Sequence, residues 1–216
     1  MGSTIGTGSG RAKTYLSKPQ PGHTIYPYLL RAVSIERVNQ VWSTDITYVP
    51  MATGSLYLCA VIDWYSRFIL SWPLSNTAPV NWLLADFCVD ALQGALSKWG
   101  KPKILNTDLG GVPQGSQFTS HSFPNPLIDN QIKISMDGKG RALDNIFIER
   151  FWRTIKHEHF YLRTYSEGRE LHDGLSNYVR FYNQDRKHQS LGYQTPATWY
   201  KKGESAIPLL NSTSLD

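Results

Sequence analysis

The clearest pattern along the chain is the alternation of side chains from Val41 to Pro50. Successive strand residues point to opposite faces of a sheet, and this segment is rich in aromatic and β-branched residues. It therefore predicts a strand with Asp45 near its middle. The run Leu56–Ile62 is almost entirely apolar, as in a strand covered on both faces, and Phe68–Leu74 predicts a third strand. Because the connections are short, we expect an antiparallel meander.

The rest of the pattern alternates between helical and strand periodicity. Helices are expected at Val80–Trp99, Leu143–Phe160 and Leu171–Asn183, and strands at Lys103–Asp108 and Ile132–Ser135. The predicted fold is α/β, with a five-stranded mixed sheet flanked by helices. In that sheet, crossover strands extend the three-strand meander.

Composition limits the class of protein. A chain of 216 residues with 41% hydrophobic residues can bury one sizeable core. We expect a flexible basic leader at 1–22, the domain at 23–202 and a disordered tail at 203–216. The longest apolar run has seven residues, too few to span a bilayer, so no membrane partner is expected. The two cysteines lack the spacing of a zinc knuckle, which favours the reducing cytoplasm.

Charge is unevenly distributed, with basic residues in excess at both ends and acidic residues in excess between 43 and 138. A net charge of +5 with an acidic centre suits a metal site flanked by a surface that binds polyanions. An ordinary solvated surface fits equally well, so charge alone does not decide.

Three acidic residues stand at positions where side chains can converge. Asp45 is in mid-strand, Asp108 ends a strand before a glycine-rich loop, and Glu149 lies inside a helix. On a helical wheel, Asn145, Arg153 and Lys156 lie within about 40° of Glu149, and the apolar residues Ile148, Phe151 and Ile155 cluster at roughly the opposite side. Such a stripe can place an acidic side chain that binds a metal ion beside basic side chains that bind phosphate groups. Each residue alone could equally belong to a surface ion pair.

Six sequence motifs follow one another along the chain, and their number and order make the pattern specific. They are Asn39–Pro50, Val61–Arg67, Asn106–Asp108, Gly115–Ser120, Asp144–Lys156 and Phe181–Pro196. In these segments the chain resembles the integrase-type catalytic core of bacterial insertion-sequence transposases, which are relatives of retroviral integrase. The resemblance covers roughly residues 20–200.

The resemblance implies a ribonuclease H-like fold and a catalytic Asp–Asp–Glu triad at Asp45, Asp108 and Glu149. It implies cleavage of DNA at transposon ends and joining of the 3′-hydroxyl to a target strand. Two Mg²⁺ ions, for which Mn²⁺ can substitute, are expected to activate the attacking oxygen and stabilise the leaving oxygen. Asp45 is expected to bridge both ions, with Asp108 on one and Glu149 on the other.

We expect DNA, as transposon ends and as target, to be the main partner, with contacts from a set of polar and basic residues. The set comprises Asn145, Arg153, Lys156, Gln117, Arg141 and His188. A solvated helix end is an equal alternative for His188. Further expectations are a homo-oligomer, a location at the nucleoid, and recognition of the ends by a separate helix-turn-helix protein of the same element.

The chain departs from the family pattern after Asp108. The segment Leu109–Pro113 is inserted there, so that 40 residues separate Asp108 from Glu149, five more than is typical of the family. The insertion puts the placement of Gln117 in doubt. Two alternatives follow: a catalytically impaired remnant that binds DNA nonspecifically or associates with full-length transposase, and a structure-selective nuclease of the same fold.

Other residues with possible chemistry are assigned structural roles. Asp63 precedes a turn and is expected to cap that turn rather than to bind metal. Asp144 is expected to cap the start of the second long helix. Trp152 borders the basic stripe and is expected to pack. Glu158 lies on the opposite side of the helix from Glu149.

Overall fold

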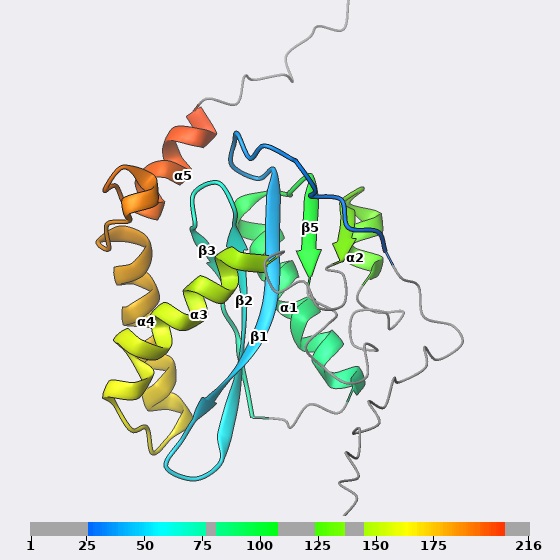
Figure 1. The fold of residues 1–216 in the computed structure, drawn as a ribbon. Coiled ribbons are helices and arrows are strands. Elements are labelled where there is room, and N and C mark those ends of the chain that lie inside the picture. The colour runs from blue at the N-terminus through cyan, green and yellow to red at the C-terminus, as the bar shows by residue number, and fades with distance from the viewer. Residues whose placement is uncertain (1–25, 77–80, 108–123, 137–144, 206–216) are drawn as a thin grey trace, which may run out of the picture.

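A computed structural model of the protein describes residues 26–76, 81–107, 124–136 and 145–205. In it, one sheet lies between two layers of helices (Figure 1). The strands are β1 Val41–Pro50, β2 Ser55–Asp63, β3 Ile69–Ser71, β4 Leu74–Ser75, β5 Ile104–Thr107 and β6 Lys133–Met136. The helices are α1 Asn81–Trp99, α2 Pro124–Asp129, α3 Ile146–Glu158, α4 Gly168–Gln184 and α5 Pro196–Ser205, with short 3₁₀ turns η2 Phe160–Leu162 and η3 Gln189–Leu191.

The sheet has the predicted mixed topology. Its strand order is β3-β2-β1-β5-β6, with β4 paired to β2. The pairs β1–β2 and β2–β3 are antiparallel, whereas β5 pairs in parallel with both β1 and β6. The meander and the crossover strands are therefore both confirmed.

The prediction of five strands was wrong, because the third predicted strand is divided in two. β3 and β4 both pair with β2, but Trp72 and Pro73 separate them. Proline has no backbone N–H to donate to a ladder. The Pro73 carbonyl still accepts a 3.2 Å hydrogen bond from the Cys59 N–H, so the chain stays beside β2 across the break.

Two hydrophobic clusters fix the layers on either side of the sheet. One cluster joins β1 and β2 to α3 and α4, and the other joins the opposite face to α1, α2 and α5. In Figure 1, α3 crosses in front of the sheet and α1 lies behind it. The sequence predicted neither α2 nor α5. α2 has six residues, too few to show a periodicity, and α5 includes residues 203–205, where the tail was expected to begin. Residues 1–22 and the rest of that tail lie outside the described part.

The helix α3 is strongly amphipathic, as predicted. Ile148, Phe151 and Ile155 are at most 1% exposed and face the sheet. The helix ends at Glu158, two residues before the predicted end, and η2 follows it after His159. Its predicted start at Leu143, like the expected capping residue Asp144, lies outside the described residues.

The turn after β2 supports the first turn of α3. Asp63 is fully buried and accepts hydrogen bonds from the Asn39 N–H, the Ser66 N–H and the Ser66 hydroxyl, at 2.9, 2.8 and 2.7 Å. Burial raises the pKa of Asp63 above its usual value, and these hydrogen bonds oppose the rise. The turn ends at Arg67, whose guanidinium lies 3.5 Å from the ring centroid of Phe147 on α3. The expected capping role of Asp63 is confirmed.

A polar cluster holds the other end of α3 against α4. Arg186 donates to Glu158 from Nη2 at 2.6 Å and from Nε at 2.9 and 3.2 Å, and the Tyr178 hydroxyl donates to Glu158 at 2.9 Å. The His188 ring packs edge-on against Tyr182, with centroids 4.9 Å apart, and its Nε2 is 3.5 Å from Arg186 Nη1. Burial and the nearby guanidinium groups of Arg186 and Arg67 lower the pKa of His188 to about 4.

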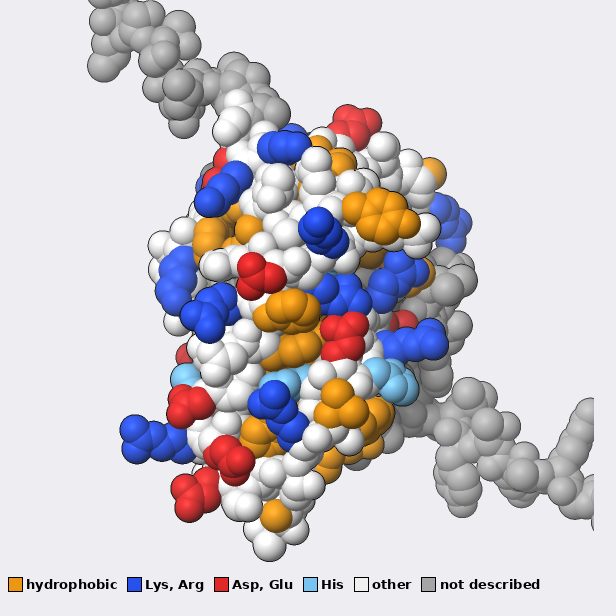
Figure 2. Space-filling model, turned by 90° about the vertical axis from the view of Figure 1, so that its left-hand side faces the viewer, with side chains coloured by type: hydrophobic (Ala, Val, Ile, Leu, Met, Phe, Trp, Pro, Cys, Tyr) orange, Lys and Arg blue, Asp and Glu red, His pale blue; other side chains and the backbone are white. Residues whose placement is uncertain are grey.

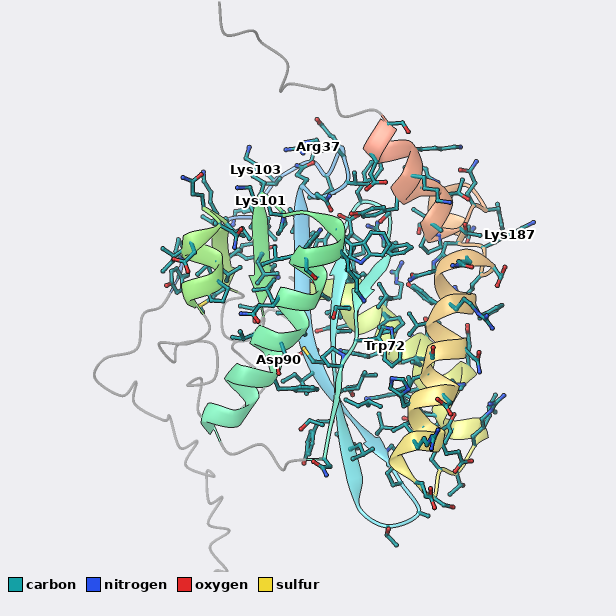
Figure 3. The ribbon with its side chains drawn as sticks, turned by 180° about the vertical axis from the view of Figure 1, so that it is seen from behind. Arg37, Trp72, Asp90, Lys101, Lys103 and Lys187 are labelled. Carbon is teal, nitrogen blue, oxygen red and sulfur yellow. The ribbon has the colours of Figure 1, made fainter. Side chains whose placement is uncertain are left out.

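We predict that Asp63→Asn destabilises the fold by about 2 kcal/mol, because an amide can accept at only one of the two oxygen positions and leaves a buried donor unsatisfied. The midpoint temperature of thermal unfolding should fall by about 5 °C. The matched control is Asp90→Asn, on the exposed side of α1, which should change stability by less than about 0.5 kcal/mol (Figure 3). An equal effect of the two changes would contradict the capping role.

We also predict that His188 remains neutral at pH 7 and titrates with a midpoint near 4, followed by its ring resonances in NMR spectra. A lowered pKa in the fold means that His188 contributes stability above pH 6.5, and this contribution is lost as the pH falls toward 4. Arg186→Met removes one of the opposing charges and should raise the midpoint. A midpoint near 6.5 in the unaltered protein would show that the ring is solvated instead.

Candidate active site

The site begins with Asp45 in the middle of the central strand. Asp45 is half-buried on β1, where its register partner on β2 is Ala60. Its side chain points to the same face of the sheet as Val41 and Val49, because alternate residues share a face. Both valines belong to the hydrophobic cluster beneath α3, so this helix crosses the face that carries Asp45.

One hydrogen bond joins α3 directly to Asp45. The Trp152 Nε1–H donates to Asp45 Oδ2 at 2.8 Å. Glu149 lies three residues before Trp152, and residues three apart are neighbours on a helix surface. The Glu149 side chain is exposed and lines an open groove of about 430 Å³ together with Trp152. Trp152 therefore contacts Asp45 through its N–H and lines the groove beside Glu149, which lies 104 positions after Asp45 in the chain.

The third predicted acid lies just beyond the described residues. β5 is described as far as Thr107, which pairs in parallel with Thr44 on β1. Asp45 and Asp108 are the next residues of these two segments. Within the described ranges, no three acidic, histidine or cysteine side chains gather as a metal site would require. Convergence of all three acids thus stays a prediction.

Basic and aromatic side chains line the rest of the groove. Arg153 and Lys156 lie on the same side of α3 as Glu149, and His157 and Tyr161 complete the lining. The Lys156 ammonium lies 5.4 Å from the ring centroid of Tyr48, an exposed residue of β1. The groove therefore combines cations that can bind phosphate oxygens with aromatic surfaces.

Other residues expected to bind DNA are not brought to this groove. Asn145 is at the start of α3 but is only 2% exposed, and within the described part of the chain neither its amide oxygen nor its amide nitrogen has a hydrogen-bond partner. His188 contacts Arg186 in the Glu158 cluster, on the opposite side of α3 from Glu149. Gln117 and Arg141 lie outside the described residues.

The surface beside α4 and α5 has an uneven charge. In Figure 2, Lys and Arg side chains gather over its upper part, near α5, whereas acidic side chains lie mostly lower. Exposed acids of the first half of α4 include Glu170 and Asp173. A polyanion would be repelled from that lower half.

Sequence reasoning assigned Trp152 to packing and did not find its bond to Asp45. It also gave no role to Tyr48, which lies near the groove because β1 and α3 cross, or to Tyr161 on η2, which follows α3. The available signal was the position of Trp152 at the border between the apolar face and the basic stripe. An indole at such a border buries its rings and directs its N–H outward.

The sequence matches two family models and several transposases of bacterial insertion sequences. Two integrase core domain family models match residues 35–142 and 130–196. InsK of insertion sequence element IS150 from Escherichia coli (strain K12) is 33% identical over 187 residues, which cover 86% of this chain and 63% of InsK. The transposase of IS904 from Lactococcus lactis is 32% identical over 165 residues, or 76% of this chain and 62% of that protein. The chain thus spans less than two thirds of the length of these curated relatives.

Solved structures support the fold. The catalytic core of HTLV-2 integrase, determined in complex with magnesium, matches 75% of this chain and 96% of that chain, with a TM-score of 0.56 and 19% identity. A chain of the simian T-cell lymphotropic virus intasome matches 92% of this chain and 65% of that chain, with a TM-score of 0.63 and 17% identity. The predicted ribonuclease H-like α/β fold is confirmed.

No helix within the described ranges has the length and apolarity needed to cross a membrane. The ordered motifs, the sheet topology, the pairing of α3 with β1 and the matched relatives all agree. The chain belongs to the integrase core domain family, among the transposases of bacterial insertion sequences in the retroviral integrase superfamily.

Proposed function

We propose that the chain is the catalytic core of a transposase that cleaves DNA at the ends of an insertion sequence and transfers the strand to a target. The observation that carries this proposal is the Trp152–Asp45 hydrogen bond. It fixes α3 across β1, so that Glu149 lies within one helical turn of the residue that contacts Asp45. Glu149 lines the groove, and Asp45 is bonded to Trp152, which lines the same groove.

The two described carboxylates fit a divalent cation. Mg²⁺ binds hard oxygen ligands, and both the half-buried Asp45 and the exposed Glu149 carry carboxylate oxygens. With Asp108 they would complete a three-carboxylate site. When bound, a pair of Mg²⁺ or Mn²⁺ ions supplies activation of the attacking oxygen and stabilisation of the leaving oxygen.

The residues of α3 would hold the DNA. Arg153 and Lys156 present cations beside Glu149, where they can bind phosphates next to the scissile bond. Phosphate contacts fix the position of a duplex and carry no sequence information. Selection of the transposon ends would then come from other contacts, and a separate helix-turn-helix protein remains our prediction. The catalytic core domain of HTLV-2 integrase was determined in trimeric and dimeric forms, which supports our expectation of a homo-oligomer.

We predict strand transfer from a labelled duplex with the element's terminal sequence into plasmid DNA, in the presence of Mg²⁺ or Mn²⁺. Asp45→Asn and Glu149→Gln should each lower the rate by about 1,000-fold, since losing a metal ligand removes several kcal/mol of transition-state stabilisation. Asp90→Asn is the control and should leave the rate unchanged. Product from either site variant at the control rate would refute the assignment.

A variant lacking Leu109–Pro113 belongs in the same assay. Product from this deletion alone would show that the insertion impairs the chain. No product from any version, with DNA binding retained, would favour the catalytically impaired remnant.

We further predict that DNA binds along α3. Arg153→Ala combined with Lys156→Ala should lower the affinity for duplex DNA at least tenfold and reduce the salt slope by about 2, because two phosphate contacts are lost. The control replaces Lys101 and Lys103 by Ala, an equal change of charge at the end of the sheet where β5 begins (Figure 3). Fluorescence anisotropy over a salt series measures both quantities. An equal loss in the control would indicate a diffuse electrostatic attraction rather than a site.

A further inference from the structure

Trp152 has two environments. Its rings are buried, with the side chain only 6% exposed, and they pack against Phe151 with centroids 5.1 Å apart. Its N–H reaches the neighbouring strand and bonds to Asp45 at 2.8 Å. The packing fixes where the N–H points, so the donor is held rigidly by the core of the domain.

The acceptor distinguishes Trp152 from other tryptophans of the described ranges. Trp42, Trp99 and Trp199 donate to neutral carbonyl oxygens, of Asn39, Leu70 and Leu191 respectively. The buried N–H of Trp64 has no partner among the residues that the structure describes, so a core position alone does not require one. The bond from Trp152 ends on a carboxylate oxygen, and charge-assisted hydrogen bonds are shorter and stronger than neutral ones.

The bond restricts how the Asp45 carboxylate can rotate. A carboxylate that is held at one oxygen presents a defined set of lone pairs to a cation. Partners that orient metal-binding side chains change metal affinity by about 10- to 100-fold when they are removed. The same indole lines the groove beside Glu149, so one side chain contacts Asp45 and borders the groove that Glu149 faces.

We propose that Trp152 is a positioning residue, whose indole N–H orients the Asp45 carboxylate for binding a divalent cation between Asp45 and Glu149. This inference rests on the function proposed above. Trp152 itself touches neither the metal nor the DNA in this proposal. Its effect passes entirely through Asp45.

The test is Trp152→Phe, which keeps an aromatic ring and removes the donor. Binding of Mn²⁺ is followed by the electron paramagnetic resonance signal of the free ion, so the readout needs neither DNA nor turnover. We expect the dissociation constant to rise about 10- to 100-fold. The matched control is Trp99→Phe, which loses an N–H bond to a carbonyl on the other face of the sheet and should shift the constant less than twofold.

A second variant guards against misfolding. The analogue 3-benzothienylalanine at position 152 keeps the bicyclic shape and carries sulfur in place of the N–H. It should weaken Mn²⁺ binding as much as Trp152→Phe does, while the midpoint temperature of thermal unfolding stays near that of the unaltered chain. Unchanged Mn²⁺ affinity with the analogue would overturn the proposal, as would affinity in the unaltered chain that does not depend on Asp45.

Strand transfer in the same samples separates the two proposals. With Trp152→Phe, the Mg²⁺ concentration for half-maximal rate should rise while the rate at saturating Mg²⁺ largely recovers. If the unaltered chain is active and Trp152→Phe does not change the Mg²⁺ concentration for half-maximal rate, the positioning role alone is rejected. An inactive unaltered chain whose Mn²⁺ affinity still depends on Trp152 rejects the proposed strand transfer alone.

Discussion

The packing of α3 across the central strand is the contact on which the site depends. Its buried stripe meets the odd-numbered face of β1, and that face also carries Asp45. Turning the helix by one residue, about 100°, would remove Glu149 from the groove and replace an apolar contact by a charged one. The hydrophobic free energy that docks the helix therefore also determines which side chains face Asp45.

Both ends of α3 are held by charged groups that contact aromatic or acidic partners. At the first turn, the Arg67 guanidinium lies over Phe147, and its position follows from the buried Asp63 turn. At the last turn, Arg186 and Tyr178 hold Glu158. A helix fixed at both ends and along its apolar face keeps Glu149 on a rigid element, and rigid elements hold reacting groups more accurately than loops do.

Much of the fold followed from periodicity. The strand Val41–Pro50 has the predicted bounds, and the apolar stripe of α3 is the one read from its helical wheel. The break between β3 and β4 was missed because a run of apolar residues hides where Pro73 interrupts the ladder. α2 was missed because six residues give no period. Short elements and interruptions depend on neighbours in space, which local patterns do not record.

By itself, the sequence determined the family, the central strand and the side of α3 that carries Glu149, because periodicity and motif order are local properties of the chain. The tertiary structure decided what each polar side chain meets. It placed the Trp152 N–H on Asp45 and directed His188 toward Arg186, away from Glu149. The Trp152–Asp45 hydrogen bond joins residues 107 positions apart, and its geometry is fixed only when the hydrophobic faces of sheet and helix have packed.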